Sequence, residues 1–155
     1  MPEKPPDPHD LAINTFTHIW YCRYEKVGFE KMTEPEKVIF SVWQFHCEVN
    51  NGGFHQFFIN PAGDFAAAAL IGLIRMGAHH AATLLGRAMA VFPGDNPPKE
   101  QDARIKILCA LPEIMQYEYL DQLTREFFDS PEHLYAMESA YIEQNREHYI
   151  GLDQM

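Results

Sequence analysis

The stretch that decides the fold reads E-V-N-N-G-G-F-H-Q-F-F-I-N, from Glu48 to Asn60. An apolar segment with helical periodicity runs into two consecutive glycines directly after Asn51, so one element must end there and another begin. Glycine adopts a positive φ at little cost, and Gly52 or Gly53 is therefore expected to end the helix. The aromatic residues that follow lie at i, i+3 and i+4, on one face of a short helix, and they are Phe54, Phe57 and Phe58. The segment predicts a corner between two helices that places these rings in a core, with a ligand-touching loop as the alternative.

The run N-G-G-F-H-Q-F-F-I-N, residues 51–60, also resembles the signature of the DNA mimic protein nineteen-like family of small bacterial proteins. The resemblance extends from about Thr33 to about Ile150 and includes an acidic C-terminal part. It implies an all-helical fold. It further implies an acidic homodimer that occupies the DNA-binding face of a helix-turn-helix transcription factor and blocks operator binding. Because proteins can share a fold without sharing an activity, these implications are expectations for this chain.

Length and composition indicate a single domain. At 155 residues the chain is long enough to bury roughly 68–70 per cent of its unfolded surface. Its hydrophobic content of 46% argues against general disorder. We expect a flexible arm over residues 1–9, rich in proline and charge, and one all-helical domain over residues 10–155. The arm lacks the basic-then-apolar order of a secretory signal, and no run is long enough to cross a membrane, which predicts a cytoplasmic protein.

Apolar spacing and capping signals predict seven or eight helices and no strands. Thr33-Glu34-Pro35-Glu36 has the form of a capping box, which should open a helix that reaches about Asn50. Gly77 should end a later helix, and Ser130-Pro131 should open the last one as an N-cap followed by a first-turn proline. The expected helices cover residues 10–28, 34–50, 54–58, 65–76, 79–92, 100–111, 112–129 and 130–150.

The net charge of −10 is unevenly distributed. Residues 1–50 carry eight acids and five bases, residues 51–112 carry four and five, and residues 113–155 carry ten and two. The negative charge is therefore concentrated near the C-terminus. Such a surface repels nucleic acid and anionic membranes, and it speeds the encounter with basic proteins. We expect neither direct nucleic-acid binding nor a membrane partner.

Two helix faces in this C-terminal third carry the acids. After Pro112, apolar residues at i, i+3 and i+7 form an inward stripe, and the same spacing recurs in the last helix. The stripes are Leu120, Leu123 and Phe127, and Leu134, Met137 and Tyr141. If the two helices pack as neighbours, their outer faces run roughly parallel. Glu143 and Glu147 add an unfavourable like-charge pair at i and i+4. The predicted partner-binding carboxylates are Glu118, Asp121, Asp129, Glu132, Glu138, Glu143 and Glu147.

Signs of catalysis are weak. The chain contains no H-E-x-x-H spacing, no nucleophile elbow and no phosphate-binding glycine loop. The three cysteines have no C-x-x-C spacing, which argues against a disulfide framework or a zinc finger. We therefore expect a non-enzymatic protein without a cofactor or metal. His46, His55 and His79 nevertheless leave a small metal-dependent enzyme open as an alternative.

Two binding functions fit the acidic C-terminal part. The first, favoured by the family resemblance, is a DNA mimic whose partner is a basic DNA-binding protein of the helix-turn-helix class. The second is an immunity-type inhibitor of a basic nuclease toxin, because a nuclease cleft is positively charged for the same reason as a repressor surface. An ordinary solvated surface remains the simplest explanation for any single acidic helix face.

Overall fold

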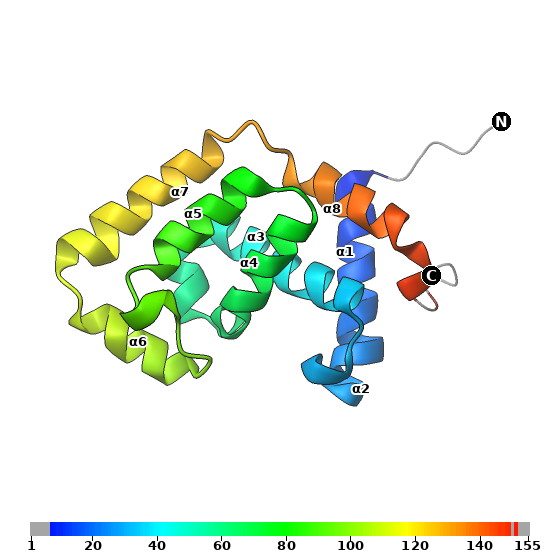
Figure 1. The fold of residues 1–155 in the computed structure, drawn as a ribbon, viewed down its shortest axis with the longest axis horizontal. Coiled ribbons are helices and arrows are strands. Elements are labelled where there is room, and N and C mark those ends of the chain that lie inside the picture. Colours follow the sequence, from blue (N-terminus) through cyan, green and yellow to red (C-terminus); the bar gives the residue numbers. More distant parts are fainter. Residues whose placement is uncertain (1–6, 150, 152–155) are drawn as a thin grey trace.

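The computed structural model describes residues 7–149 and Gly151, and its regular elements there are all helical (Figure 1). The predicted all-α class is confirmed. Helix α1 (Pro8–Ile19) continues through a π-helical turn (Trp20–Tyr24) into α2 (Glu25–Val27). The other helices are α3 (Glu34–Ile59), α4 (Ala66–Arg75), α5 (His79–Met89), α6 (Gln101–Ala110), α7 (Leu120–Phe128), which follows a π-helical turn (Ile114–Tyr119), and α8 (Leu134–Gln144). Short 3-10 turns cover Phe29–Lys31, Pro61–Phe65, Pro93–Asp95 and Arg146–His148.

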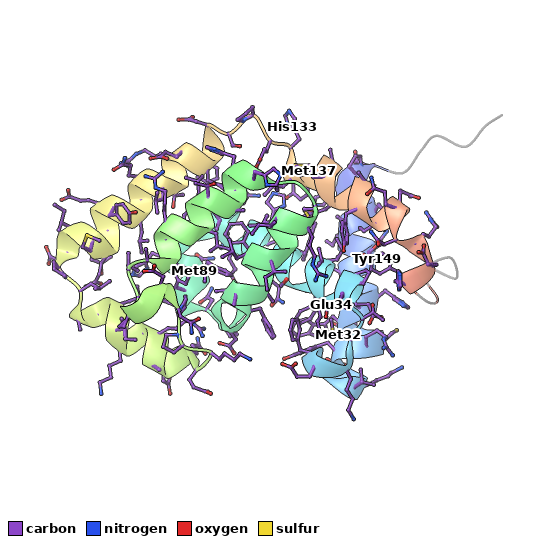
Figure 2. The ribbon with its side chains drawn as sticks, in the orientation of Figure 1. Met32, Glu34, Met89, His133, Met137 and Tyr149 are labelled. Carbon is purple, nitrogen blue, oxygen red and sulfur yellow. The ribbon has the colours of Figure 1, made fainter. Side chains whose placement is uncertain are left out.

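Helix α3 is the centre of the fold, since it contacts α1, α4, α6, α7 and α8. Residues along its length, from Val38 to Phe58, contribute to a core with α4, α5 and α7, and Ile39, Phe40 and Trp43 near its start contribute to a second core with α1 and α8. Tyr149, labelled in Figure 2, closes the second core, and its hydroxyl donates to the Pro35 carbonyl at 3.2 Å. One long helix thus joins the two halves of the molecule.

The start of α3 forms as the capping box predicts. The Glu36 amide donates to the Thr33 hydroxyl at 3.3 Å, and the Thr33 amide donates to the Glu36 carboxylate at 2.8 Å. The same carboxylate is buried and accepts a hydrogen bond from Arg23 Nε at 2.8 Å. The cap therefore also attaches the π-helical turn after α1 to the start of α3.

The double-glycine corner is confirmed as a bend within the residues assigned to α3. Gly52 has φ −151° and Gly53 has φ +79°, a left-handed conformation that favours glycine. After the bend the chain is helical again as far as Ile59, and the rings of Phe54, Phe57 and Phe58 are fully buried. The Phe54 amide, freed by the bend, donates to the Thr124 hydroxyl of α7 at 3.2 Å.

Polar side chains hold the two sides of the corner together. One oxygen of Glu48 accepts hydrogen bonds from Gln56 Nε2 at 2.7 Å and from Asn60 Nδ2 at 2.9 Å. These three residues all belong to the segment that decides the fold, and they lie before and after the bend. These hydrogen bonds between side chains therefore stabilise the corner in addition to the two glycines.

Arg104 of α6 is a buried cation that the sequence reasoning missed. Its guanidinium donates to four backbone carbonyls and pairs with Asp64 Oδ1 at 2.7 Å. The four carbonyls belong to Phe58, Asn60, Pro98 and Lys99, at distances of 2.7 to 3.0 Å. The end of α3 and the proline-rich loop before α6 are thereby held by one side chain.

The helix boundaries differ from the prediction at both ends. Helix α1 begins at Pro8 with Asp7 as its N-cap, so Pro8 and His9 are helical although the arm was expected to include them, and residues 1–6 lie outside the described part. The last helix begins at Leu134, not at Ser130-Pro131. The Ser130 hydroxyl accepts from the Glu132 amide at 3.1 Å, which makes a local turn instead. Ile150, the predicted helix end, is outside the described residues.

No single helix of the described chain is long and apolar enough to cross a membrane. Helix α3 and the segment Pro61–Arg75 meet that test only as a pair, and the pair is bent by 76°.

Helices α3 and α8 share a buried acid–base pair. His46 Nδ1 lies 3.1 Å from Glu138 Oε1, and Glu138 is 0% exposed. The second oxygen of Glu138 has no hydrogen-bond donor among the described residues. Burial raises the pKa of the Glu138 carboxyl, an effect that the hydrogen bond from His46 opposes. Burial also raises the pKa of the neighbouring Cys47 thiol to about 12, so this cysteine is protonated at neutral pH.

The first prediction concerns the corner. Gly53→Ala should lower the free energy of unfolding by about 1–3 kcal/mol, because the backbone is left-handed and the new Cβ would lie 2.7 Å from the Thr124 hydroxyl. Gly86→Ala in α5 is the matched control: its Cβ meets nothing within 4 Å, and the change should stabilise the chain by up to about 1 kcal/mol. Urea unfolding measures both. Equal effects of the two substitutions would contradict the assigned role of Gly53.

The second prediction concerns Glu138. Its raised pKa means that the folded chain holds the proton more tightly than the unfolded chain does. The stability from the protonated carboxyl is therefore full below the ordinary glutamate pKa of 4.5, and it is lost as pH rises through the raised pKa. Glu138→Gln removes this loss, so its unfolding free energy relative to that of the wild type should increase as pH rises above about 4.5 and through the raised pKa.

The control is Glu143→Gln. Glu143 is exposed, and its hydrogen bond with Arg146 lowers the pKa of its carboxyl, so no such increase is expected. Urea unfolding at a series of pH values gives the comparison. If the wild type and Glu138→Gln keep a constant difference across the range, the buried carboxyl does not hold its proton as described.

Candidate partner-binding surface

The outer face of α7 carries exposed carboxylates, as the helix pattern predicts. Leu120, Leu123 and Phe127 are buried, and they face α3 and α5. The acids Glu118, Asp121 and Asp129 are exposed on the other side, along the edge of the molecule that Figure 1 shows in yellow. This half of the predicted acidic surface is therefore oriented toward solvent.

Two of the four carboxylates on this face, Glu118 just before α7 and Asp129 just after it, have no compensating cation among the described residues. Asp121 pairs with Arg125 at 2.5 Å, but both side chains are well exposed, and such pairs contribute little to stability. Glu118 and Asp129 have no ion pair anywhere in the described part of the chain. Glu126, which the prediction omitted, pairs with Arg87 of α5. The α7 face thus keeps a net negative charge.

The carboxylates at the end of α8 are arranged differently from the prediction. Helix α8 ends at Gln144, and Asn145 (φ −122°, ψ 24°) separates Glu143 from Glu147. The expected like-charge pair at i and i+4 on one helix is therefore wrong. Glu143 instead accepts two hydrogen bonds from the Arg146 guanidinium, at 2.9 and 3.1 Å, and both glutamates are exposed.

The two acidic helices do not form one surface. Helix α7 packs on α3 and α5, whereas α8 packs on α1 and α3, and Figure 1 shows them at different ends of the upper edge. The condition for two parallel acidic faces, that α7 and α8 pack as neighbours, is therefore not met. Sequence reasoning placed the buried stripe of α7 correctly, but it assigned the buried Glu138 of α8 to the solvent face, and it could not place the two helices relative to each other.

Two of the predicted site residues have internal partners. Glu132 is half-buried, and its carboxylate accepts from the backbone amides of His80 and Ala81 at 2.8 and 3.0 Å, so it caps α5. A carboxylate at a helix N-terminus is favoured by the helix dipole. Glu138 is buried against His46, and a partner cannot reach it on this surface. Its assignment to the partner-binding set is corrected for that reason.

The signature corner and the acidic face meet at one hollow, which the sequence reasoning missed. This hollow has a volume of about 360 Å³ and lies between the bend of α3 and the π-helical turn before α7. It is lined by Gly52, His55, Gln116, Tyr117, Glu118, Leu120, Asp121 and Thr124. The two walls are more than fifty residues apart in the chain, and no local pattern links them.

The three histidines considered for a metal site lie in separate environments. His46 pairs with Glu138, the His55 ring stacks on Tyr117 at 5.3 Å, and His79 is exposed at the start of α5. Burial lowers the pKa of His55. Within the described ranges, 7–149 and 151, no group of three or more His, Cys, Asp or Glu side chains is placed to hold a metal ion.

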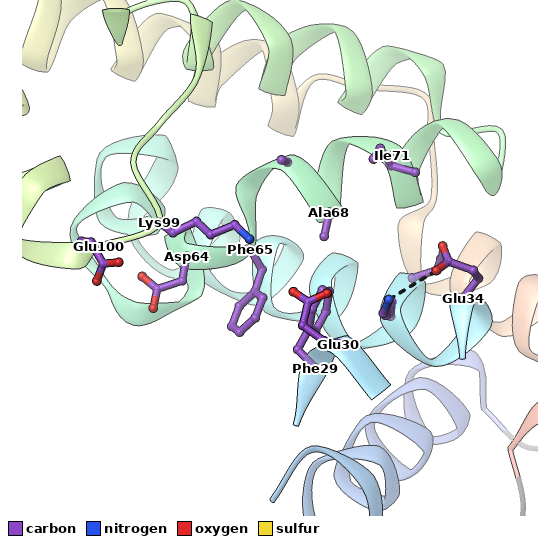
Figure 3. A pocket seen from close by; sticks show the side chains of 12 residues that line it. Phe29, Glu30, Glu34, Asp64, Phe65, Ala68, Ile71, Lys99 and Glu100 are labelled. Carbon is purple, nitrogen blue, oxygen red and sulfur yellow. Dashed lines mark hydrogen bonds and ion pairs between the residues drawn. The ribbon is translucent and has the colours of Figure 1, made fainter. Parts of the chain in front are cut away.

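A second pocket, of about 450 Å³, lies beside α4 and is shown in Figure 3. Its floor is apolar and includes Phe29, Phe65 and Ile71. Several of the charged groups at its rim already have partners: Glu34 pairs with Lys37 and Arg75, and Asp64 pairs with Arg104. These pairs leave the rim with little net charge that could select a ligand.

Comparison with family models places the chain among known proteins. The model described as DMP19-like protein matches residues 30–145, which is more than half of the chain and covers α3 to α8. No curated protein and no solved structure gave a match. The matched region contains both the signature corner and the acidic face of α7. The chain therefore belongs to the DMP19-like protein family.

Proposed function

We propose that this protein is a DNA mimic that binds a basic DNA-binding protein, of the helix-turn-helix transcription-factor class, and keeps it off its operator. Two points support the proposal. The chain belongs to the DMP19-like family, and the α7 face exposes carboxylates that no cation of the described chain neutralises. The second point assigns the proposed function to particular residues, the unpaired carboxylates of the α7 face.

The geometry of the α7 face suits this role. Glu118 and Asp129 lie about three helical turns apart, so they share one side of the helix, about 16 Å apart along its axis. Asp121 lies between them. A DNA-binding protein presents Lys and Arg side chains to regularly spaced phosphates, and a rigid row of carboxylates offers them the same sign of charge. The α8 carboxylate Glu143, by contrast, is already bonded to Arg146.

The proposal includes the assembly and location of the protein. We assign it a homodimeric, non-enzymatic role in the cytoplasm, where transcription factors act. Sedimentation of the purified protein gives the assembly state directly.

The third prediction tests the mimic by competition. Fluorescence anisotropy of a labelled operator bound to a helix-turn-helix factor of the source bacterium should fall when this protein is added at about 50 mM salt. The effect should weaken by orders of magnitude at about 200 mM salt, because the attraction is electrostatic. Unchanged operator occupancy with excess protein at low salt, for each such factor tested, would contradict the proposal.

A pair of charge-reversal variants locates the surface. Glu118→Lys combined with Asp129→Lys should weaken competition at least roughly tenfold, since it replaces attraction by repulsion at the α7 face. Glu143→Lys combined with Glu147→Lys changes the net charge by the same amount on α8 and should have a much smaller effect. Equal losses in the two double variants would show that only the total charge matters.

A further inference from the structure

The hollow between the signature corner and the π-helical turn has walls of different chemistry. Gly52, which has no side chain, and the His55 ring form one side. Tyr117 and Glu118 belong to the other side, on a π-helical turn, a type of distortion that is frequent at functional sites. Tyr117 is 57% exposed, and its ring lies over His55 with an interplanar angle of 30°. The hollow therefore has a flat aromatic surface that is open to solvent.

The charged groups around the hollow have one sign. Two carboxylates line it, those of Glu118 and Asp121, and no lysine or arginine does. Glu118 has no ion pair among the described residues, and Asp121 is held only by the exposed side chain of Arg125. Burial lowers the pKa of His55, so the imidazole is neutral at neutral pH. The hollow thus attracts cations and repels anions.

A buried amide adds a second, independent observation. Gln116 lines the hollow and is only 7% exposed. Its Nε2 donates to the Leu111 carbonyl at 2.7 Å, and its amide oxygen has no donor in the described part of the structure. Solvent reaches this oxygen, which is not among the buried unpaired atoms, so it is free to accept a hydrogen bond from a group that enters the hollow. The oxygen therefore suits a ligand that brings N–H groups.

We propose that this hollow binds the guanidinium of an arginine side chain presented by the basic partner. The inference rests on the proposed function and names the side chain that is recognised. A guanidinium is planar and offers five N–H donors, so it can bond a carboxylate and an amide oxygen while it stacks on an aromatic ring. The Tyr117 ring supplies the stacking surface, and Glu118 with Gln116 supplies the acceptors.

The same geometry disfavours lysine. An ammonium group is a compact, strongly hydrated charge without a flat face, so it cannot stack on Tyr117 while it bonds Glu118. Arginine is also the residue that most often reads guanine and clamps phosphate in DNA-binding proteins. An arginine with which the partner contacts DNA could not make that contact while its guanidinium is bound in this hollow.

The fourth prediction uses a ligand that requires no knowledge of the partner. Amide NMR spectra are recorded while N-acetyl-arginine amide or N-acetyl-lysine amide is added at low salt. The arginine derivative should shift the signals of Gly52, Gly53, His55 and Tyr117, and it should bind roughly fivefold or more tightly than the lysine derivative. Equal affinities, or shifts that lie mainly elsewhere, would overturn the assignment.

Matched variants test the two walls. Tyr117→Leu and Glu118→Gln should each weaken arginine binding roughly fivefold. Tyr21→Leu and Glu143→Gln are the controls: Tyr21 is 59% exposed on the turn after α1, Glu143 is exposed on α8, and neither lines the hollow. These controls should bind like the wild type. Equal losses in variants and controls would overturn the assignment.

The competition assay separates this inference from the proposed function. If Tyr117→Leu and Glu118→Gln lose arginine binding and also compete less well for the factor, both proposals are supported. If the wild type competes and the two variants compete equally well, the arginine site is wrong while the mimic stands. If arginine binds in the hollow but no factor is displaced, the site stands while the mimic function is wrong.

Discussion

The guanidinium of Arg104 is a charge in the protein interior, and the architecture around the corner depends on it. Desolvating an ion costs several kcal/mol, and four carbonyls together with the Asp64 carboxylate offset that cost. A helix end leaves carbonyls without partners, and here one side chain bonds two of them, at Phe58 and Asn60. Helix α6 is thereby fixed against α3, and the chain runs from α6 directly into the turn that carries Tyr117.

Local signals in the sequence were sufficient for most of the fold. The capping box at Thr33 and Glu36, the positive φ of Gly53 and the buried stripe of α7 each depend on residues within one or two helical turns of each other. Such short-range rules predict where a helix begins, which face it buries and where the chain bends. They failed at Ser130, because a serine hydroxyl can close a local turn as easily as it can cap a helix.

The candidate site was less predictable because it depends on long-range packing. Helical periodicity indicates that a carboxylate lies on a helix, but not what the neighbouring helix places beside it. Periodicity therefore does not distinguish Glu138 from Glu143, although Glu138 is buried and paired with a histidine ninety-two positions away on α3. The hollow combines the corner of α3 with the turn before α7 in the same way. The sequence alone contains no signal that would predict either contact. It also contains no signal that Arg104 is buried.

The close approach of Gly53 to Thr124 has a consequence for how the family can evolve. A side chain at position 53 would collide with the threonine, and a larger residue at position 124 would collide with the glycine backbone and lose the hydrogen bond to Phe54. Neither position can be substituted independently of the other, although the two positions are distant in sequence. In an alignment of relatives the two positions should therefore change together or not at all, and this coupling would identify chains that keep the same contact between α3 and α7 even where the acidic surface has diverged.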